Sequence, residues 1–170
     1  MRRAAKYLHR KAFKSFTIEG NRILISSPTY DWEKNGFPVN EGPEEIENSD
    51  GNIFITYPAS FCGTDAYCLG MLSLKEGGDP LNANDWAKSS TPVFTTNAAG
   101  GAFGPGHNGF FVSPDDTEDW IIYHANPQSG LGCGDSRNPR MQKFTWNADG
   151  TPNFGSPVAI NTPIKKPSGE

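Results

Sequence analysis

The sequence has few cysteines, little charge and no long apolar run, and each shortage excludes a class of protein. Only three of 170 residues are Cys and 20% are charged. No segment approaches the roughly 18 apolar residues of a transmembrane helix, so no membrane partner is expected. By contrast, 19 glycines and 14 prolines together make 33 of the 170 residues. That many chain-bending residues predicts numerous turns and excludes a helical bundle or coiled coil.

Charge is distributed unevenly along the chain. The first fourteen residues hold six of the fifteen Lys and Arg residues and no acid, whereas the remainder has nine basic against nineteen acidic residues. A body that acidic repels phosphate backbones, so no nucleic-acid partner is expected. The basic leader, residues 1–15, lacks the apolar stretch of a secretory signal peptide. It is interpreted as an organelle-targeting segment or as an exposed or misassigned terminus.

The three cysteines, Cys62, Cys68 and Cys133, match neither a disulfide framework nor a zinc-binding pattern. Two interpretations stay open at this point. Cys62 and Cys68 close a small loop by a disulfide, or the cysteines are buried free thiols.

Short stretches rich in β-branched and aromatic residues predict an all-β fold. Polar turn signals separate them, at residues 49–52, 77–80, 113–116 and 147–150. Only residues 84–88 could form a helical turn. The predicted strands lie within residues 22–26, 52–57, 69–74, 109–112, 119–123 and 141–146.

An internal repeat organises these strands. An offset of 66 positions aligns two copies, and each copy ends in a short Pro-Val segment, at residues 92–94 and 157–158. Four strands per copy, repeated radially, is the organisation of a β-propeller blade, and known propellers have about four to eight blades. The chain is therefore predicted to form part of a ring. The aligned pairs are Glu41 and His107, Ile46 and Val112, Phe54 and Trp120, Ile55 and Ile121, Tyr57 and Tyr123, and Ala59 and Ala125.

Glu41 and His107 are the candidate functional residues that the repeat singles out. Equivalent starts of innermost strands face one central cavity, and both residues are flanked by bend-forming Gly and Pro. A carboxyl and an imidazole in one cavity are plausible catalytic or metal-binding groups. The alternative is a solvated loop acid and a hydrogen-bonded core histidine.

Several longer motifs resemble family 43 glycoside hydrolases, and within them the α-L-arabinofuranosidase-like members of a fungal style. The resemblance covers residues 16–164, and the leader matches nothing in the family. Its most specific elements are the paired Asn-Glu-Gly-Pro and Gly-Pro-Gly-His-Asn segments. The motifs are residues 26–33 (SSPTYDWE), 39–43 (VNEGP), 54–57 (FITY), 104–108 (GPGHN), 123–125 (YHA), 137–142 (RNPRMQ) and 146–155 (WNADGTPNFG).

The resemblance implies a five-bladed propeller, of which residues 16–170 would form about the last three blades. It also implies hydrolysis, with inversion, of linkages in arabinose-containing plant cell-wall polysaccharide. Glu41 matches the general acid, His107 a histidine at an axial metal site, commonly calcium with a water shell, and Arg140, less securely, a substrate-contacting arginine. No organic cofactor is expected. His124 has no specific family match and is expected to be a core histidine.

One departure from the family concerns the aspartate that would act as the catalytic base. The family's first-blade and second-blade aspartates should precede Ser26, yet the first 25 residues contain no Asp. The chain is therefore predicted to lack the base aspartate. Asp31 is either a contact at the rim of the pocket or a solvated loop residue, and the second interpretation is preferred.

Three functions are considered for such a chain. The first is a glycosidase that acts on arabinose- or xylose-containing carbohydrate and is extracellular in its full-length relatives, although this chain shows no signal peptide. The second is a catalytically inactive carbohydrate-binding or remnant propeller fragment. The third, a kelch-like interaction propeller, lacks the expected repeat signatures.

Overall fold

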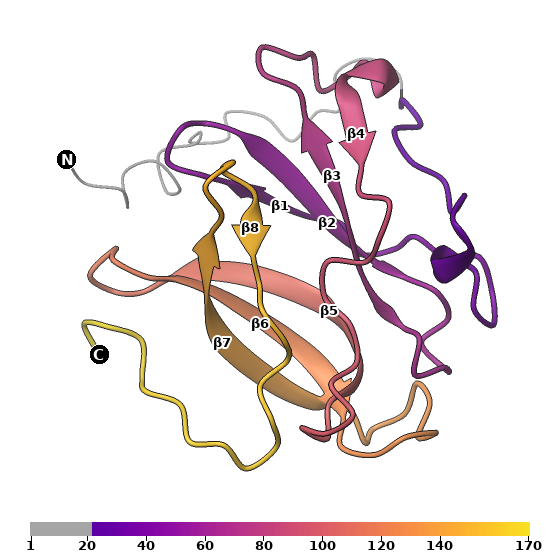
Figure 1. Cartoon of the computed structure of the whole chain (residues 1–170), viewed down its shortest axis with the longest axis vertical. Helices are drawn as coiled ribbons and strands as arrows, with labels where there is room; N and C mark the ends of the chain where they lie inside the picture. Colours follow the sequence, from indigo (N-terminus) through magenta and orange to yellow (C-terminus); the bar gives the residue numbers. More distant parts are fainter. Residues whose placement is uncertain (1–21) are drawn as a thin grey trace.

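The computed structural model describes residues 22–170, which form two four-stranded antiparallel sheets (Figure 1). The basic leader predicted for residues 1–15 lies outside the described residues. Within the described part, no helix is long and apolar enough to cross a membrane. The all-β prediction is confirmed, since the only helical elements described are two three-residue 3₁₀ turns, η1 (Asp31–Glu33) and η2 (Ala83–Asp85).

The first sheet has the strand order β1-β2-β3-β4. Neighbouring strands follow one another in the sequence, as antiparallel pairing allows, and are joined by a short turn at residues 48–52 and by longer loops at residues 60–67 and 75–85. Ile46 pairs with Phe54, and Phe54 with Ser73. The strands are β1 (Glu44–Glu47), β2 (Ile53–Ala59), β3 (Cys68–Leu74) and β4 (Trp86–Lys88).

The second sheet repeats this layout in the order β5-β6-β7-β8. Its first strand is irregular, with register shifts between Phe103 and Gly106 and between Gly106 and Gly109. Such bulges bend a strand and redirect its side chains. The strands are β5 (Phe103–Val112), β6 (Asp119–Asn126), β7 (Asn138–Trp146) and β8 (Pro152–Asn153).

The predicted repeat is confirmed, because the aligned strands β2 and β6 each lie second in their sheet. Three strand predictions were wrong. Residues 22–26 form no strand, and Ile25 instead packs its side chain against the first sheet. Residues 92–94 and 157–158 are not fourth strands, because Phe94 makes a single bridge with Leu69 and the Val158 N–H donates to side chains of Tyr123 and Gln142.

The largest core lies between the two sheets. Ile46, Phe54 and Leu69 from the first sheet pack in one cluster with Ile121 and Phe144 from the second. A second cluster, built on Tyr57, Ala59, Cys68 and Leu72, covers the other face of the first sheet and receives Ile25 and Trp32 from the preceding segment. Each face of the first sheet is therefore buried against a different part of the chain.

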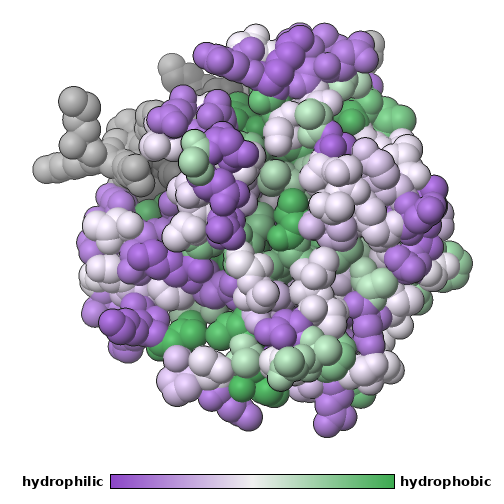
Figure 2. All heavy atoms as spheres, viewed as in Figure 1, coloured by the Kyte–Doolittle hydropathy of each residue, from purple (hydrophilic) through white to green (hydrophobic). Residues whose placement is uncertain are grey.

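The two sheets match the blade organisation that the repeat predicts, but the number of blades in a ring stays a prediction. Among the described residues before β1, the secondary structure is η1 and one isolated bridge, between Asn40 and Ala59. Figure 2 shows apolar surface in a band through the centre of the view and near its lower edge, with polar surface between. Leu24, Phe37 and Leu81 are among the most exposed large apolar residues.

Candidate functional site

Glu41 lies just before β1, at the end of the first sheet where β2 finishes. Its backbone N–H donates to the Pro58 carbonyl at 3.0 Å, and the preceding Asn40 bridges to Ala59. Gly42 follows with a φ of 42°, a left-handed conformation that costs glycine little. These contacts fix the backbone of the turn and leave the Glu41 side chain exposed.

His107 occupies the bulged part of β5 with a φ of 50°, which is uncommon for a non-glycine residue. Such strain persists only where surrounding contacts impose it, and it is concentrated at functional sites. The His107 ring packs over Gly42, where an added β-carbon would lie 3.4 Å from ring atom Cε1. The structure thus brings His107 beside the turn that carries Glu41.

Three rings form a continuous stack next to this turn. The centroid of the Tyr67 ring lies 6.2 Å from that of His124, and the His124 centroid lies 5.9 Å from that of His107, with interplanar angles of 9° and 18°. The Tyr67 hydroxyl donates a hydrogen bond to Oε1 of Glu41. Burial, followed by this hydrogen bond and the Glu41 charge, raises the pKa of Tyr67. Tyr67 therefore remains a protonated donor at neutral pH.

Arg137 joins the stack from the loop before β7. Its guanidinium carbon lies 5.0 Å from the Tyr67 ring centroid, and Nη1 lies 3.1 Å from Nδ1 of His124. Because arginine only donates, Nδ1 of His124 accepts, and the neutral ring carries its proton on Nε2. Burial, together with the charges of Arg137 and His107, lowers the pKa of His124 and favours the same neutral form.

His124 is therefore hydrogen-bonded and half-buried, but it belongs to this ring stack rather than to the apolar core. Sequence reasoning missed both Tyr67 and Arg137. A signal for them exists, because each residue directly precedes the third strand of its sheet, β3 or β7. The same offset of 70 positions relates Met71 and Met141, which lie in the predicted strands at residues 69–74 and 141–146.

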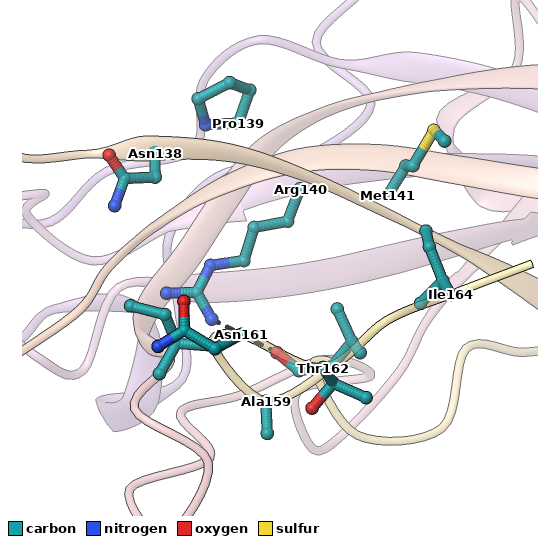
Figure 3. A pocket seen from close by; sticks show the side chains of 10 residues that line it. Asn138, Pro139, Arg140, Met141, Ala159, Asn161, Thr162 and Ile164 are labelled. Atoms are coloured by element: carbon teal, nitrogen blue, oxygen red, sulfur yellow. Dashed lines mark hydrogen bonds between the residues drawn. The ribbon is translucent and has the colours of Figure 1, made fainter.

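Arg140 lies in a different place from the Glu41 turn. Its Nη1 donates to the Val158 carbonyl at 3.1 Å and its Nη2 to the Gly101 carbonyl at 2.7 Å. Figure 3 shows its side chain extending toward the segment that carries Asn161 and Thr162, in a groove of about 300 Å³. The groove is lined by residues 138–141, 158–162 and 164, none of which belongs to the ring stack. The substrate role of Arg140 stays a prediction.

The axial metal predicted at His107 also stays a prediction. In residues 22–170, no group of three or more His, Cys, Asp and Glu side chains is placed to hold a metal ion. Calcium prefers six to eight oxygen ligands. His107 supplies one exposed imidazole, so the described residues do not fit a protein cage for this cation.

A second ionic cluster, centred on Glu33, was not predicted. Glu33 is fully buried, and Nζ of Lys88 lies 2.9 Å from its Oε1. Asn40 and Tyr57 also donate to Oε1, and the backbone N–H groups of residues 29 and 30 donate to Oε2. Burial acts to raise the pKa of Glu33, but the hydrogen bonds from Lys88, Tyr30, Asn40 and Thr29 outweigh it and lower the pKa. Glu33 is therefore ionised in the folded protein.

The sequence-based expectation for Asp31, a neighbour of Glu33 in the sequence, can be compared with the structure. Asp31, which precedes Glu33 by two residues, has a fully exposed side chain whose Oδ1 lies 3.7 Å from Nζ of Lys34. This agrees with the preferred interpretation of Asp31 as a solvated loop residue.

The proposed Cys62–Cys68 disulfide is wrong, because Cys62 bonds to Cys133, 71 residues away, and Cys68 is a buried free thiol. The partner of Cys62 is set by the meeting of loops from the two sheets, which spacing along the chain does not reveal.

The fold and site define an all-β protein built from repeated four-stranded sheets, with a carboxylate, a tyrosine and two stacked imidazoles at one end. The profile of the family described as glycosyl hydrolases family 43 matches residues 3–152. The chain belongs to this family.

Individual proteins with similar sequences support the assignment to this family. The chain is 49% identical over 162 residues to an extracellular exo-α-(1→5)-L-arabinofuranosidase of Streptomyces avermitilis, covering 91% of this chain and 33% of that protein. It is 42% identical over 157 residues to α-L-arabinofuranosidase 43 of Humicola insolens, covering 88% of this chain and 32% of that protein. The chain thus spans about a third of the length of these relatives.

Solved structures show the same fold. The crystal structure of an α-L-arabinofuranosidase from Lactobacillus brevis superposes with a TM-score of 0.76 at 41% identity, over 83% of this chain and 44% of that one. A thermostable family-43 glycoside hydrolase gives a TM-score of 0.75 at 28% identity, over 91% of this chain and 47% of that one.

Proposed function

We propose that this chain supplies the general acid, Glu41, of an extracellular glycoside hydrolase that removes arabinofuranosyl groups from arabinose-containing plant cell-wall carbohydrate. The proposal rests on the surroundings of the Glu41 carboxyl group. Its Oε1 is held by the buried Tyr67 hydroxyl, and its Oε2 has no hydrogen-bond partner among the described residues. The exposed side chain can therefore present Oε2 to a leaving-group oxygen.

Inversion at the anomeric carbon requires a second carboxylate as the base. The two carboxyl groups of inverting glycosidases lie roughly 6.5–9.5 Å apart, so that a water molecule fits between the base and the sugar. We therefore propose that the base is an aspartate that this chain lacks, because the family's base aspartate should precede Ser26 and the first 25 residues contain no Asp.

The similarity to α-L-arabinofuranosidases supports the choice of an arabinose-containing substrate. The exposed His107 ring, at the end of the ring stack, also offers surface against which a sugar can lie, as amphipathic aromatic groups do at many binding sites. The competing function, carbohydrate binding without catalysis, shares these features. It differs from the proposal only in what Glu41 does.

The experiment separates binding from acid catalysis. Arabino-oligosaccharide binding to the 170-residue chain is measured by titration calorimetry, and hydrolysis is followed with and without azide. Azide can attack the anomeric carbon in place of a base-activated water, while the departing sugar oxygen takes the proton of Glu41. We expect binding, slow unassisted hydrolysis and faster azide-dependent cleavage.

Glu41→Gln should reduce azide-dependent cleavage of the oligosaccharide by on the order of 10²–10⁴, the usual contribution of a general acid or base. It should have far less effect on an activated aryl arabinofuranoside, whose leaving group needs no proton. The matched control is Glu44→Gln, an exposed neighbour at the start of β1, which should change neither rate. Absence of binding would contradict the proposal, and binding with rates insensitive to Glu41→Gln would favour the non-catalytic function. Fast unassisted hydrolysis that Glu41→Gln abolishes would place the base within this chain.

A further inference from the structure

Two equivalent loops meet at the end of the molecule that carries Glu41. Residues 60–67 connect β2 to β3, and residues 127–137 connect β6 to β7. The Cys62–Cys133 disulfide joins the two loops covalently. Asp65 ties them again, since it accepts hydrogen bonds from the Ser129 hydroxyl and, at 3.1 Å, from the Gly130 N–H. The last residue of each loop is a member of the cluster described above, Tyr67 in one and Arg137 in the other.

The Arg137 guanidinium bridges these loops by hydrogen bonds to three backbone segments. Its Nη2 donates to the Cys62 carbonyl at 2.6 Å, and its Nη1 to the Gly104 carbonyl at 2.6 Å. Its Nε donates to the Gly132 carbonyl at 3.2 Å. Only a planar fork with several fixed donors can satisfy acceptors in this arrangement, so lysine is not an equivalent residue here.

The same guanidinium closes one side of the Tyr67 ring. It lies 5.0 Å from the ring centroid, while Gly106 allows a close approach of the ring, since a β-carbon there would lie 2.2 Å from Cε1 of Tyr67. The Tyr67 ring is thus confined by Gly106 and Arg137 and stacked on His124. Confinement of the ring fixes the position of its hydroxyl, which donates to Glu41.

We propose that Arg137 is a positioning residue for the carboxyl group of Glu41, acting through Tyr67. Arg137 contributes no hydrogen bond to Glu41 itself. It holds the ring whose hydroxyl restrains Oε1, and so keeps Oε2 directed toward the substrate. The assignment of Glu41 as the acid rests on the proposed function, whereas the linkage from Arg137 through Tyr67 to Glu41 can be tested without any substrate.

The test is the side-chain carboxyl ¹³C resonance of Glu41 in protein labelled at glutamate, assigned by its loss in Glu41→Gln. Tyr67→Phe removes the hydrogen bond and should shift this resonance. Arg137→Met should shift it in the same direction, by at least half as much, although Arg137 donates no hydrogen bond to Glu41. Lys143→Met, which removes a cation from the exposed part of β7, is the matched control and should leave the resonance unchanged.

Arg137→Lys provides a second variant that keeps the cation and loses the fork. It should also shift the resonance, and it replaces Arg137→Met if that protein does not fold. A wild-type resonance position in the folded Arg137 variant would overturn the proposal, as would a Tyr67→Phe variant without a shift. Failure of Glu41→Gln to affect azide-dependent cleavage would refute the acid role alone, so the two proposals can fail separately.

Discussion

The two sheets place a tyrosine at the same repeated position and use its hydroxyl differently. Tyr57 in β2 and Tyr123 in β6 are both buried. The Tyr57 hydroxyl donates to the buried carboxylate of Glu33 at 3.1 Å. The Tyr123 hydroxyl instead contacts the neutral amide oxygen of Gln142 at 2.9 Å and accepts from the Val158 N–H. The repeat thus specifies the ring and its burial, while each sheet's own neighbours specify the partner of the hydroxyl.

The same difference affects the ionisation of the two tyrosines. Burial raises the pKa of Tyr123 to about 12. Burial also raises the pKa of Tyr57, and the Glu33 charge adds to the effect. The first sheet therefore depends on a buried ion pair that has no counterpart at Tyr123. Breaking that pair should produce the largest difference in stability between variants of the two sheets.

The largest effect is expected from Lys88→Met. This change leaves the fully buried Glu33 without its cation, and removal of one partner of a buried ion pair costs about 3–5 kcal/mol. We expect a decrease of that size in the free energy of unfolding, measured by urea denaturation. Lys143→Met, which breaks the exposed pair with Glu118 beside the second sheet, should cost about 0–1 kcal/mol. Equal losses in the two variants would show that the Glu33 pair is no more important than a surface pair.

The next effect tests whether the covalent link makes the two sheets one cooperative unit. Reduction of Cys62–Cys133, which closes a loop between residues 71 apart, should destabilise the protein by about 2–4 kcal/mol. Thermal unfolding with and without reductant measures the change. The Cys62→Ser/Cys133→Ser variant provides the control, because reductant should not lower its midpoint further. The buried thiol of Cys68, whose pKa burial raises to about 12, should contribute nothing to the response.

The smallest effect compares the two tyrosines directly. Tyr57→Phe removes a hydrogen bond to a charged group, worth about 1.5–3 kcal/mol, whereas Tyr123→Phe removes neutral ones, worth about 0.5–1.5 kcal/mol. Tyr57→Phe should therefore be the more destabilising by about 1 kcal/mol in urea denaturation at pH 7. The reverse order would mean that the Glu33 carboxylate is satisfied without Tyr57.

This difference should depend on pH, with a defined sign. The pKa of Glu33 lies below its ordinary value of 4.5 in the folded protein, so its ionised form contributes stability above that pH. The contribution is lost as the pH falls through the lower, folded-state value. The gap between the two variants should therefore be constant from pH 7 to 5 and narrow below 4.5. A gap that widened in acid would contradict the ionised state of Glu33.

The sequence predicted the strands that carry the repeat better than those at the edges of the sheets. The predicted segments at residues 52–57 and 119–123 correspond to β2 and β6, which supply Phe54, Ile121 and Tyr123 to the core between the sheets. The edge strands β4 and β8 have three and two residues. Segments that short carry too little pattern to be distinguished from loops, whereas the more apolar Pro-Val segments resemble short strands in sequence.

The candidate site was predicted only where the repeat marked it. Glu41 and His107 occupy equivalent positions, and the structure brings the His107 ring beside Gly42. Tyr67 and Arg137 were missed because each belongs to an irregular loop and resembles many surface residues of its type. Their importance comes from contacts with residues far away in the sequence, such as Arg137 with the Cys62 carbonyl.

The sequence by itself determined the all-β class, the repeated layout and the residues at its equivalent positions, because hydrophobic periodicity and turn residues act over a few neighbours along the chain. Only the tertiary structure decided that Cys62 bonds to Cys133, that Glu33 is buried against Lys88, and that Arg137 confines Tyr67. Each of these contacts joins residues more than 50 positions apart. Such pairs form only after the sheets have packed, since the packing places the loops and buried charges within reach of one another.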